Sequence, residues 1–330
     1  METLQSKMSF DLLQRYRVSS ELINSVREKN PLHILDAGSR IGYLKSFLPD
    51  DVIVNLDVSF FPGSAHLVGD ILSLPFSSEA FDFSLSLDVL EHVEPSSRRE
   101  FLNEMTRVSR DFFIIGAPFR EEEVEKAEKL VNDFFLNITG AENQFLTEHI
   151  LYGLPELGEV MEWIKERNYQ AVVLPNNYLP RWMIMMCLNA YLSHLPRSGE
   201  LSIAINSLYD HQFSMFDNQP PAYRQIIIVS KSGNLDENMI RRQFAVPELP
   251  ADFHHQSWDF ANRVLSELAA HHELVLFQLQ EENNEIQRRL ELEKDKHLTA
   301  RMELEGIKGT LTYKLYKITI GCIFKKANLP

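Results

Sequence analysis

Between residues 31 and 119 the sequence alternates short apolar runs with stretches of helical spacing. Four of these runs have the composition of buried strands, at 33–35, 52–56, 83–87 and 112–116. Strands that alternate with helices are joined by right-handed crossovers, which produce a largely parallel sheet covered on both faces. The segment therefore predicts a doubly wound α/β fold. Two further runs are candidates for the sixth and seventh strands, at 171–174 and 225–230.

Breaks in these patterns divide the chain into five parts. We expect an N-terminal helical segment, a domain built on the sheet, a linker, a long helix and a basic tail, at 1–30, 31–232, 233–257, 258–311 and 312–330. Proline and glycine mark the ends of the first and third parts. Within the domain we expect two lid elements, at 135–155 and 176–224, because the second is too long and too apolar for a simple loop.

The long helix contains a heptad pattern. With Leu276 as the first a position, eight of the eleven a and d positions through Leu311 are apolar, which predicts a coiled coil. Asn283 at an a position favours a two-stranded parallel homodimer. The alternative is a solitary amphipathic helix packed on its own domain.

Charge is unevenly distributed along the chain. The formal net charge is −14, yet 306–330 contains five lysines and no acidic residue. So acidic a chain argues against nucleic acid as a partner, whereas the basic end predicts binding to an anionic membrane surface or an acidic partner. With no apolar run near ~20 residues and no signal-peptide pattern, we expect a cytoplasmic protein whose tail can hold it at the inner membrane surface.

The residues that usually bind metals form no convincing pattern. Cys187 and Cys322 are far apart in sequence, which argues against a disulfide framework or a cysteine-rich metal site. The histidine pairs at 254–255 and 271–272 are neighbours in sequence, and neighbours do not face one another on a helix. We therefore expect no metal site.

Residues 34–42 run from an apolar strand through a glycine-containing turn into a predicted helix. Such a turn lets a ligand approach the backbone closely, and the helix N-terminus offers N–H groups. The segment lacks both Gly-x-Gly-x-x-Gly and the Gly-Lys-Ser/Thr of a phosphate loop. Asp36, just before the turn, would repel phosphate and suits a ligand that bears an ammonium group.

Acidic residues follow at three further points. Asp57 closes the second strand, where an acid can accept both hydroxyls of a ribose; a helix N-cap or a turn is the alternative. Asp70 would accept the exocyclic amine of a purine while Ile71 packs on its face. Asp88 stands where the fourth strand opens into the next helix, followed by Leu90-Glu91-His92.

Taken together and in this order, these motifs resemble the class I S-adenosylmethionine-dependent methyltransferases, in the branch with Leu-Pro-Phe, Phe-Asp and Leu-Glu-His after the second strand. The resemblance covers residues 32–119. It implies a Rossmann-like seven-stranded sheet of order 3-2-1-4-5-7-6 with an antiparallel seventh strand, and S-adenosylmethionine as cofactor. Arg40 stands where the family usually has glycine, so a degenerate site is the alternative. The cofactor-binding residues that the resemblance implies are Asp36, Gly38, Ser39 and Gly42 at the methionine, Asp57 at the ribose, Asp70 and Ile71 at the adenine, and Asp88 at the pocket rim.

Motifs further along the chain suggest the acceptor. The segments 148–155, 177–182 and 221–224 resemble a bacterial subgroup often associated with glycosyltransferases of cell-surface polysaccharides. This implies methylation of a sugar or lipid-linked glycan hydroxyl, and association with a glycosyltransferase complex.

Catalysis on a hydroxyl needs a base near the methyl group. His149 is the candidate, because it follows the fifth strand in the expected lid; a structural role is the alternative. We expect His92 to pack or cap a helix, and Tyr223 and Arg224 either to orient substrate or to anchor the seventh strand. Two other functions remain open, a non-catalytic scaffold with a degenerate methyltransferase domain and a methyltransferase for a quinone or other small molecule.

Overall fold

The computed structural model describes residues 8–39, 41–62, 66–196, 198–248 and 253–326. It divides into two compact units, Met1–Glu267 and Leu268–Pro330, which are considered separately. The first unit contains one seven-stranded sheet of order β3-β2-β1-β4-β5-β7-β6. Its strands are β1 (His33–Ala37), β2 (Val52–Asp57), β3 (Leu67–Val68), β4 (Phe81–Leu87), β5 (Ser109–Ala117), β6 (Gln170–Tyr178) and β7 (Ala222–Ser230).

Strand directions match the predicted topology. Strands β1 to β5 pair in parallel, and β7 runs antiparallel to both β5 and β6. The predicted fold and strand order are therefore confirmed. The helices are α1 (Phe10–Ser25), α2 (Arg98–Val108), α3 (Glu122–Thr139), α4 (Gln144–Tyr152), α5 (Leu157–Glu166), α6 (Leu179–His194), α7 (Gly199–Gln212), α8 (Glu237–Gln243) and α9 (Phe253–Lys326), with short 3₁₀ helices η2 (Tyr43–Ser46), η3 (Leu90–His92), η4 (Pro95–Ser97) and η5 (Ser214–Phe216).

The core has two layers, one on each face of the sheet. Successive strand residues point to opposite faces, so Ile34 packs with α1 and α8, whereas Leu35 packs with α2 and α5. Both side chains are fully buried. Covering both faces explains why the strands appear in the sequence as continuous apolar runs.

The stretch expected as a linker begins inside this folded unit. Leu235, Ile240 and Phe244 are buried and join the core layer that contains α1, with Ile240 on α8. Helix α8 is short and its apolar residues are irregularly spaced, so the sequence shows no helical period that would have predicted it. Residues 233–244 therefore complete the sheet domain instead of leading away from it.

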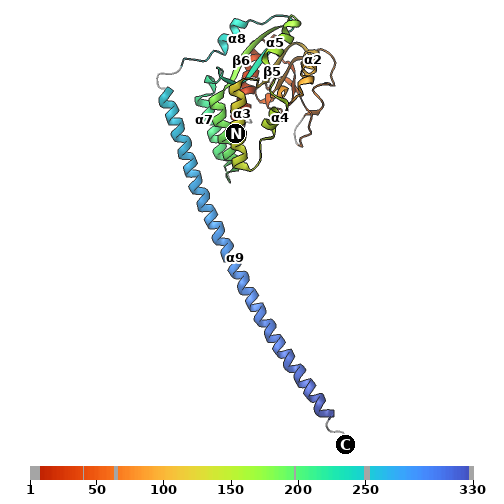
Figure 1. The fold of residues 1–330 in the computed structure, drawn as a ribbon, viewed down its shortest axis with the longest axis vertical. Coiled ribbons are helices and arrows are strands. Elements are labelled where there is room, and N and C mark those ends of the chain that lie inside the picture. The colour runs from red at the N-terminus through yellow and green to blue at the C-terminus, as the bar shows by residue number, and fades with distance from the viewer. Residues whose placement is uncertain (1–7, 40, 63–65, 197, 249–252, 327–330) are drawn as a thin grey trace. The chain divides into compact units, whose positions relative to one another are not determined.

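The described residues of the second unit, 268–326, belong to α9, a single helix of 74 residues (Figure 1). It begins at Phe253, earlier than the expected 258, and continues to Lys326 through much of the predicted tail. None of the helices in the described part of the chain is long and apolar enough to cross a membrane.

Candidate active site

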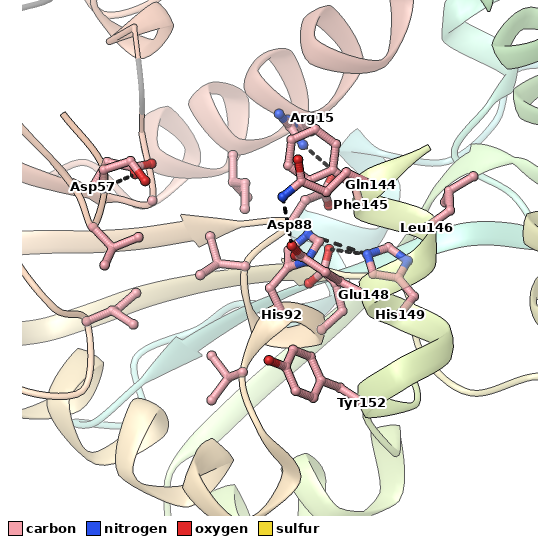
Figure 2. A pocket seen from close by; sticks show the side chains of 18 of the residues that line it. Arg15, Asp57, Asp88, His92, Gln144, Phe145, Leu146, Glu148, His149 and Tyr152 are labelled. Atoms are coloured by element: carbon pink, nitrogen blue, oxygen red, sulfur yellow. Dashed lines mark hydrogen bonds and ion pairs between the residues drawn. The ribbon is translucent and has the colours of Figure 1, made fainter. Parts of the chain in front are cut away.

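A cavity of about 810 Å³ opens where β1, β2 and β4 end. In an open α/β sheet this edge is the usual place for a ligand, and the volume is typical of small-molecule sites. Asp57 lies on one side of the cavity, while Asp88, His92, Glu148 and His149 gather on the other (Figure 2). The cavity therefore has two chemically different ends.

The turn after β1 requires its glycines. Gly38 has φ +89°, and a Cβ there would lie 2.2 Å from Cγ2 of Val89. Gly42 has φ +74°, and a Cβ there would lie 2.7 Å from Nδ2 of Asn55. The predicted helix after this turn is only the 3₁₀ helix η2. Arg40, which stands where the family usually has glycine, lies outside the described residues, so its effect on the cofactor site stays a prediction.

Five of the eight predicted cofactor residues line the cavity: Gly38, Asp57, Asp70, Ile71 and Asp88. Two others, Asp36 and Ser39, are buried behind the turn, at 1% and 2% exposed, and neither they nor Gly42 are among the lining residues. Ser39 Oγ accepts a hydrogen bond from the backbone N–H of Gly42 at 3.2 Å. These three residues support the turn without lining the cavity.

Asp36 is held in an environment that opposes its charge. Burial raises its pKa to about 6, although hydrogen bonds from Ser39 and Tyr16 and the charge of Arg15 act in the opposite direction. Tyr16 lines the cavity, so its side chain separates Asp36 from any ligand there. A cationic ligand would favour the ionised form.

We expect Asp36→Asn to stabilise the ligand-free protein in a pH-dependent way. A folded-state pKa of about 6, above the unfolded value near 3.8, means that the folded state binds the proton more tightly. Stability therefore falls as pH rises through this window, by about 3 kcal/mol in all. Urea unfolding of the variant should show a gain near that size at pH 8 and about half of it at pH 5.

The control is Asp133→Asn, on an exposed position of α3. It should leave the unfolding midpoint unchanged at both pH values. An Asp36→Asn effect that is equal at pH 5 and pH 8 would contradict this account of Asp36.

A buried charge cluster joins α1 to the sheet. Arg224 on β7 is fully buried and donates hydrogen bonds to Asp88 at 2.6 and 2.8 Å and to Asp11 at 2.7 Å. Arg15 also donates to Asp88. Burial alone would raise the pKa of Asp88, but Arg224 and Arg15 outweigh it and lower that pKa. Asp88 therefore lines the cavity as an ionised carboxylate that accepts hydrogen bonds from two arginines.

Asp11 and Arg15 also line the cavity, and no sequence motif indicated them. The only signal was their i, i+4 spacing, which places both on one side of α1. Asp88 itself has φ +54°, an uncommon conformation for a residue other than glycine. Such backbone strain is typical of functional sites.

The other end of the cavity is built from η3 and α4. Asn143 caps α4 by accepting hydrogen bonds from the backbone N–H groups of Phe145 and Leu146. The capped helix contacts η3, which brings His149 to His92, with their Nε2 atoms 3.4 Å apart. His92 lines the cavity, so its expected role in packing or capping is incomplete.

Carboxylates surround this histidine pair. Nδ1 of His149 lies 2.7 Å from Glu128 Oε1, and Nδ1 of His92 lies 2.8 Å from Glu148 Oε2. Glu91 Oε1 lies 4.0 Å from Nε2 of His149. Burial, followed by the charge of Asp88, raises the pKa of Glu91 well above its ordinary value.

The seventh strand contributes a wall to this end. Tyr223 donates a hydrogen bond to Glu128 at 3.0 Å and stacks on Trp182 with the ring centroids 3.6 Å apart. Tyr223 and Arg224 thus anchor β7 and position cavity residues, and the alternative role in orienting substrate stays a prediction.

Residues 51–111 match the family model described as a methyltransferase domain. This chain carries a methyltransferase domain. The match supports S-adenosylmethionine, the expected cofactor, as the methyl donor. The matched segment runs from β2 to the start of β5 and includes Asp57, Asp70 and Asp88, which line the cavity.

Several solved structures are similar to about two thirds of this chain. They include a SAM-dependent methyltransferase from Thermotoga maritima (14% identity, TM-score 0.40, 66% of this chain and 89% of that one). A second is the YcgJ protein from Bacillus subtilis (16%, 0.38, 65% and 97%). A third is magnesium protoporphyrin IX methyltransferase from Synechocystis with bound S-adenosylhomocysteine (9%, 0.39, 66% and 81%). At these identities and TM-scores the likeness carries no information about the acceptor. No curated protein matches the sequence.

Proposed function

We propose that this methyltransferase methylates a hydroxyl of a sugar, carried on a lipid-linked or cell-surface glycan. The observation that carries the proposal is the polar end of the cavity, where His92 and His149 stand apart from Asp57 (Figure 2). A hydroxyl must lose its proton during transfer, so it needs such groups close by.

The proposed step begins with the acceptor oxygen. It forms a bond to the methyl carbon while the methyl–sulfur bond breaks, and the released electron pair neutralises the sulfonium. Nε2 of His149 takes the proton, because Glu128 accepts from Nδ1–H and so fixes the tautomer whose Nε2 is basic. The methyl donor is already activated, so alignment and exclusion of water complete the catalysis.

Aromatic side chains at this end support a sugar acceptor. Phe145 is 42% exposed and lines the cavity together with Tyr152. Rings placed beside carboxylates and histidines suit a ligand with both apolar faces and hydroxyl groups. The open cavity and the glycines that its turn requires favour an enzyme over a degenerate scaffold.

An assay of methyl transfer tests the proposal. Wild-type protein with S-adenosylmethionine should methylate a polyisoprenoid-linked glycan and leave a quinol unchanged. His149→Gln should lower kcat about 100-fold with unchanged cofactor affinity. Preferential turnover of the quinol would overturn the acceptor class. Tight cofactor binding with no turnover of any acceptor would favour the scaffold.

We also propose that the methyltransferase forms a parallel homodimer through α9. The seam residues Leu276, Leu279, Ile286 and Leu290 are between 48% and 55% exposed, and a second copy would cover them in register. Sedimentation velocity should give a dimer, and Leu290→Lys should shift it to monomer. Arg288→Ala, outside the seam, is the control. A monomeric wild type would contradict the proposal.

The basic end of α9 is proposed to bind anionic membranes, which would place the enzyme near lipid-linked glycans and their glycosyltransferases. Lys314 and Lys317 are exposed beside Leu315 and Ile318. The full chain should sediment with anionic liposomes and remain in solution with neutral ones, whereas a chain ending before Gly306 should not sediment with either. Equal sedimentation of the two chains with anionic liposomes would refute this role.

A further inference from the structure

We propose that Glu91, His92 and His149 form a binding site for one divalent transition-metal cation at the acceptor end of the cavity. The role of the cation, to hold and polarise the acceptor hydroxyl, rests on the proposed function. The binding site itself rests only on the positions and hydrogen bonds of these side chains.

The three side chains converge on one point of the cavity. Each offers one ligand atom, and these atoms lie within 4.8 Å of one another. The two Nε2 atoms are 3.4 Å apart, and Glu91 Oε1 is 4.0 Å from that of His149. Two nitrogen ligands about 2.1 Å from a tetrahedral ion are themselves separated by about 3.4 Å.

The tautomer of His149 favours metal binding. His149 donates from Nδ1 to Glu128, so its Nδ1 carries the proton, whereas the Nδ1 of His92 lies 2.8 Å from Glu148 Oε2 without making a hydrogen bond. The Nε2 of His149 then presents its lone pair toward that of His92. A histidine whose Nδ1–H is bound by a carboxylate while Nε2 faces the ion is the usual support for a metal-binding imidazole.

Glu91 supplies an independent observation. It is 1% exposed, lines the cavity, and apart from its own backbone N–H has no hydrogen-bond donor among the described residues. A buried carboxylate without a partner is costly. Two imidazole nitrogens and the Glu91 carboxyl group thus meet at one point of the cavity, and a cation would bind all three.

The donor set indicates the type of cation. Two imidazoles and one carboxylate suit zinc, manganese or iron, whereas magnesium and calcium prefer oxygen ligands. Three protein ligands leave a position for the acceptor oxygen, whose proton the cation would make more acidic. With an ion bound, both Nε2 atoms are ligands and the proton would leave to water; proton transfer to Nε2 of His149, as proposed above, applies to the protein without the ion.

Direct binding of the metal alone tests the site without any acceptor. The full-length protein, stripped with a chelator, is titrated with Zn²⁺ and Mn²⁺ by calorimetry, and Co²⁺ is followed by its visible absorption. We expect one ion per chain, with affinity about 100-fold lower in Glu91→Gln and in His92→Gln. Glu128→Gln, which weakens the support of His149 and also alters the acceptor of the Tyr223 hydroxyl, should lower the affinity for the ion 10- to 100-fold.

Controls separate this site from other histidines. His211→Gln, at an exposed position on α7, should bind the ion as the wild type does. A variant with both α9 histidine pairs changed to alanine should also do so, at positions 254, 255, 271 and 272. Wild-type affinity for the ion in these two variants, together with weakened affinity in Glu91→Gln, supports the site.

The same samples are titrated with S-adenosylmethionine, which keeps the two proposals distinguishable. Absence of a tightly bound ion in protein that binds the cofactor would overturn the metal site and leave the methyltransferase proposal intact. An ion that Glu91→Gln still binds with wild-type affinity would also overturn it. Thermal stability adds a readout, because an ion held by these residues raises Tm in the wild type and not in Glu91→Gln.

Discussion

Asp57→Ala is expected to weaken S-adenosylmethionine binding at least 100-fold. Asp57 closes β2, lines the cavity and is 6% exposed. In the predicted complex its carboxylate accepts both ribose hydroxyls. A hydrogen bond to a charged group contributes about 1.5–3 kcal/mol, so losing two of them gives this change in Kd, which calorimetry measures.

Asp57 also fixes its own turn by accepting a hydrogen bond from the backbone N–H of Ser59 at 2.8 Å. Asp57→Asn keeps an acceptor for that turn and should lose about tenfold in affinity, which separates the loss of ligand contacts from local distortion. Asp133→Ala, exposed on α3, should bind normally. Unchanged affinity in Asp57→Ala would remove Asp57 from the cofactor site.

Arg224→Met is expected to lower the free energy of unfolding by about 3–5 kcal/mol. Arg224 is fully buried and is shared by Asp88 and Asp11, so its loss leaves both carboxylates facing each other with Arg15 as the remaining cation. Removing one partner from a buried charge network lowers the free energy of unfolding by more than the intact network raises it, because the other charges stay buried. Urea unfolding measures the change.

The double variant Arg224→Met with Asp88→Asn should recover part of this loss, since it removes one unpaired charge. Arg99→Met provides the control, because Arg99 is 67% exposed where it pairs with Glu166 and should leave the midpoint nearly unchanged. A loss in Arg224→Met no larger than in Arg99→Met would show that the cluster does not hold α1 on the sheet.

The sequence predicted the sheet well because buried parallel strands are apolar on both faces. It underestimated strands whose ends are polar. The sixth strand was expected at 171–174, yet β6 extends to Tyr178, because it pairs with β7 along this length and its polar residues find buried hydrogen-bond partners. Asn176 accepts from Arg224, and Asn177 donates to Asp11. The two-residue β3, Leu67–Val68, is exposed and too short to show an alternating pattern.

The site was predictable where a motif lies on one strand end and unpredictable where partners come from distant segments. Asp57, Asp70 and Asp88 were found because the carboxyl ends of parallel strands meet at one edge. Asp11 lies 213 residues from its partner Arg224, and no local spacing indicates that contact. For the same reason the sequence could not indicate that His149 lies beside the neighbouring residues Glu91 and His92. His149 is 57 residues from His92.

The most direct test of the central claim is a crystal structure of the full chain with S-adenosylhomocysteine. The account predicts the ribose on Asp57, the adenine beside Asp70 and Ile71, and the sulfur directed toward His92 and His149. The compound bound elsewhere, or the cavity filled by protein side chains in crystals grown with saturating compound, would contradict it.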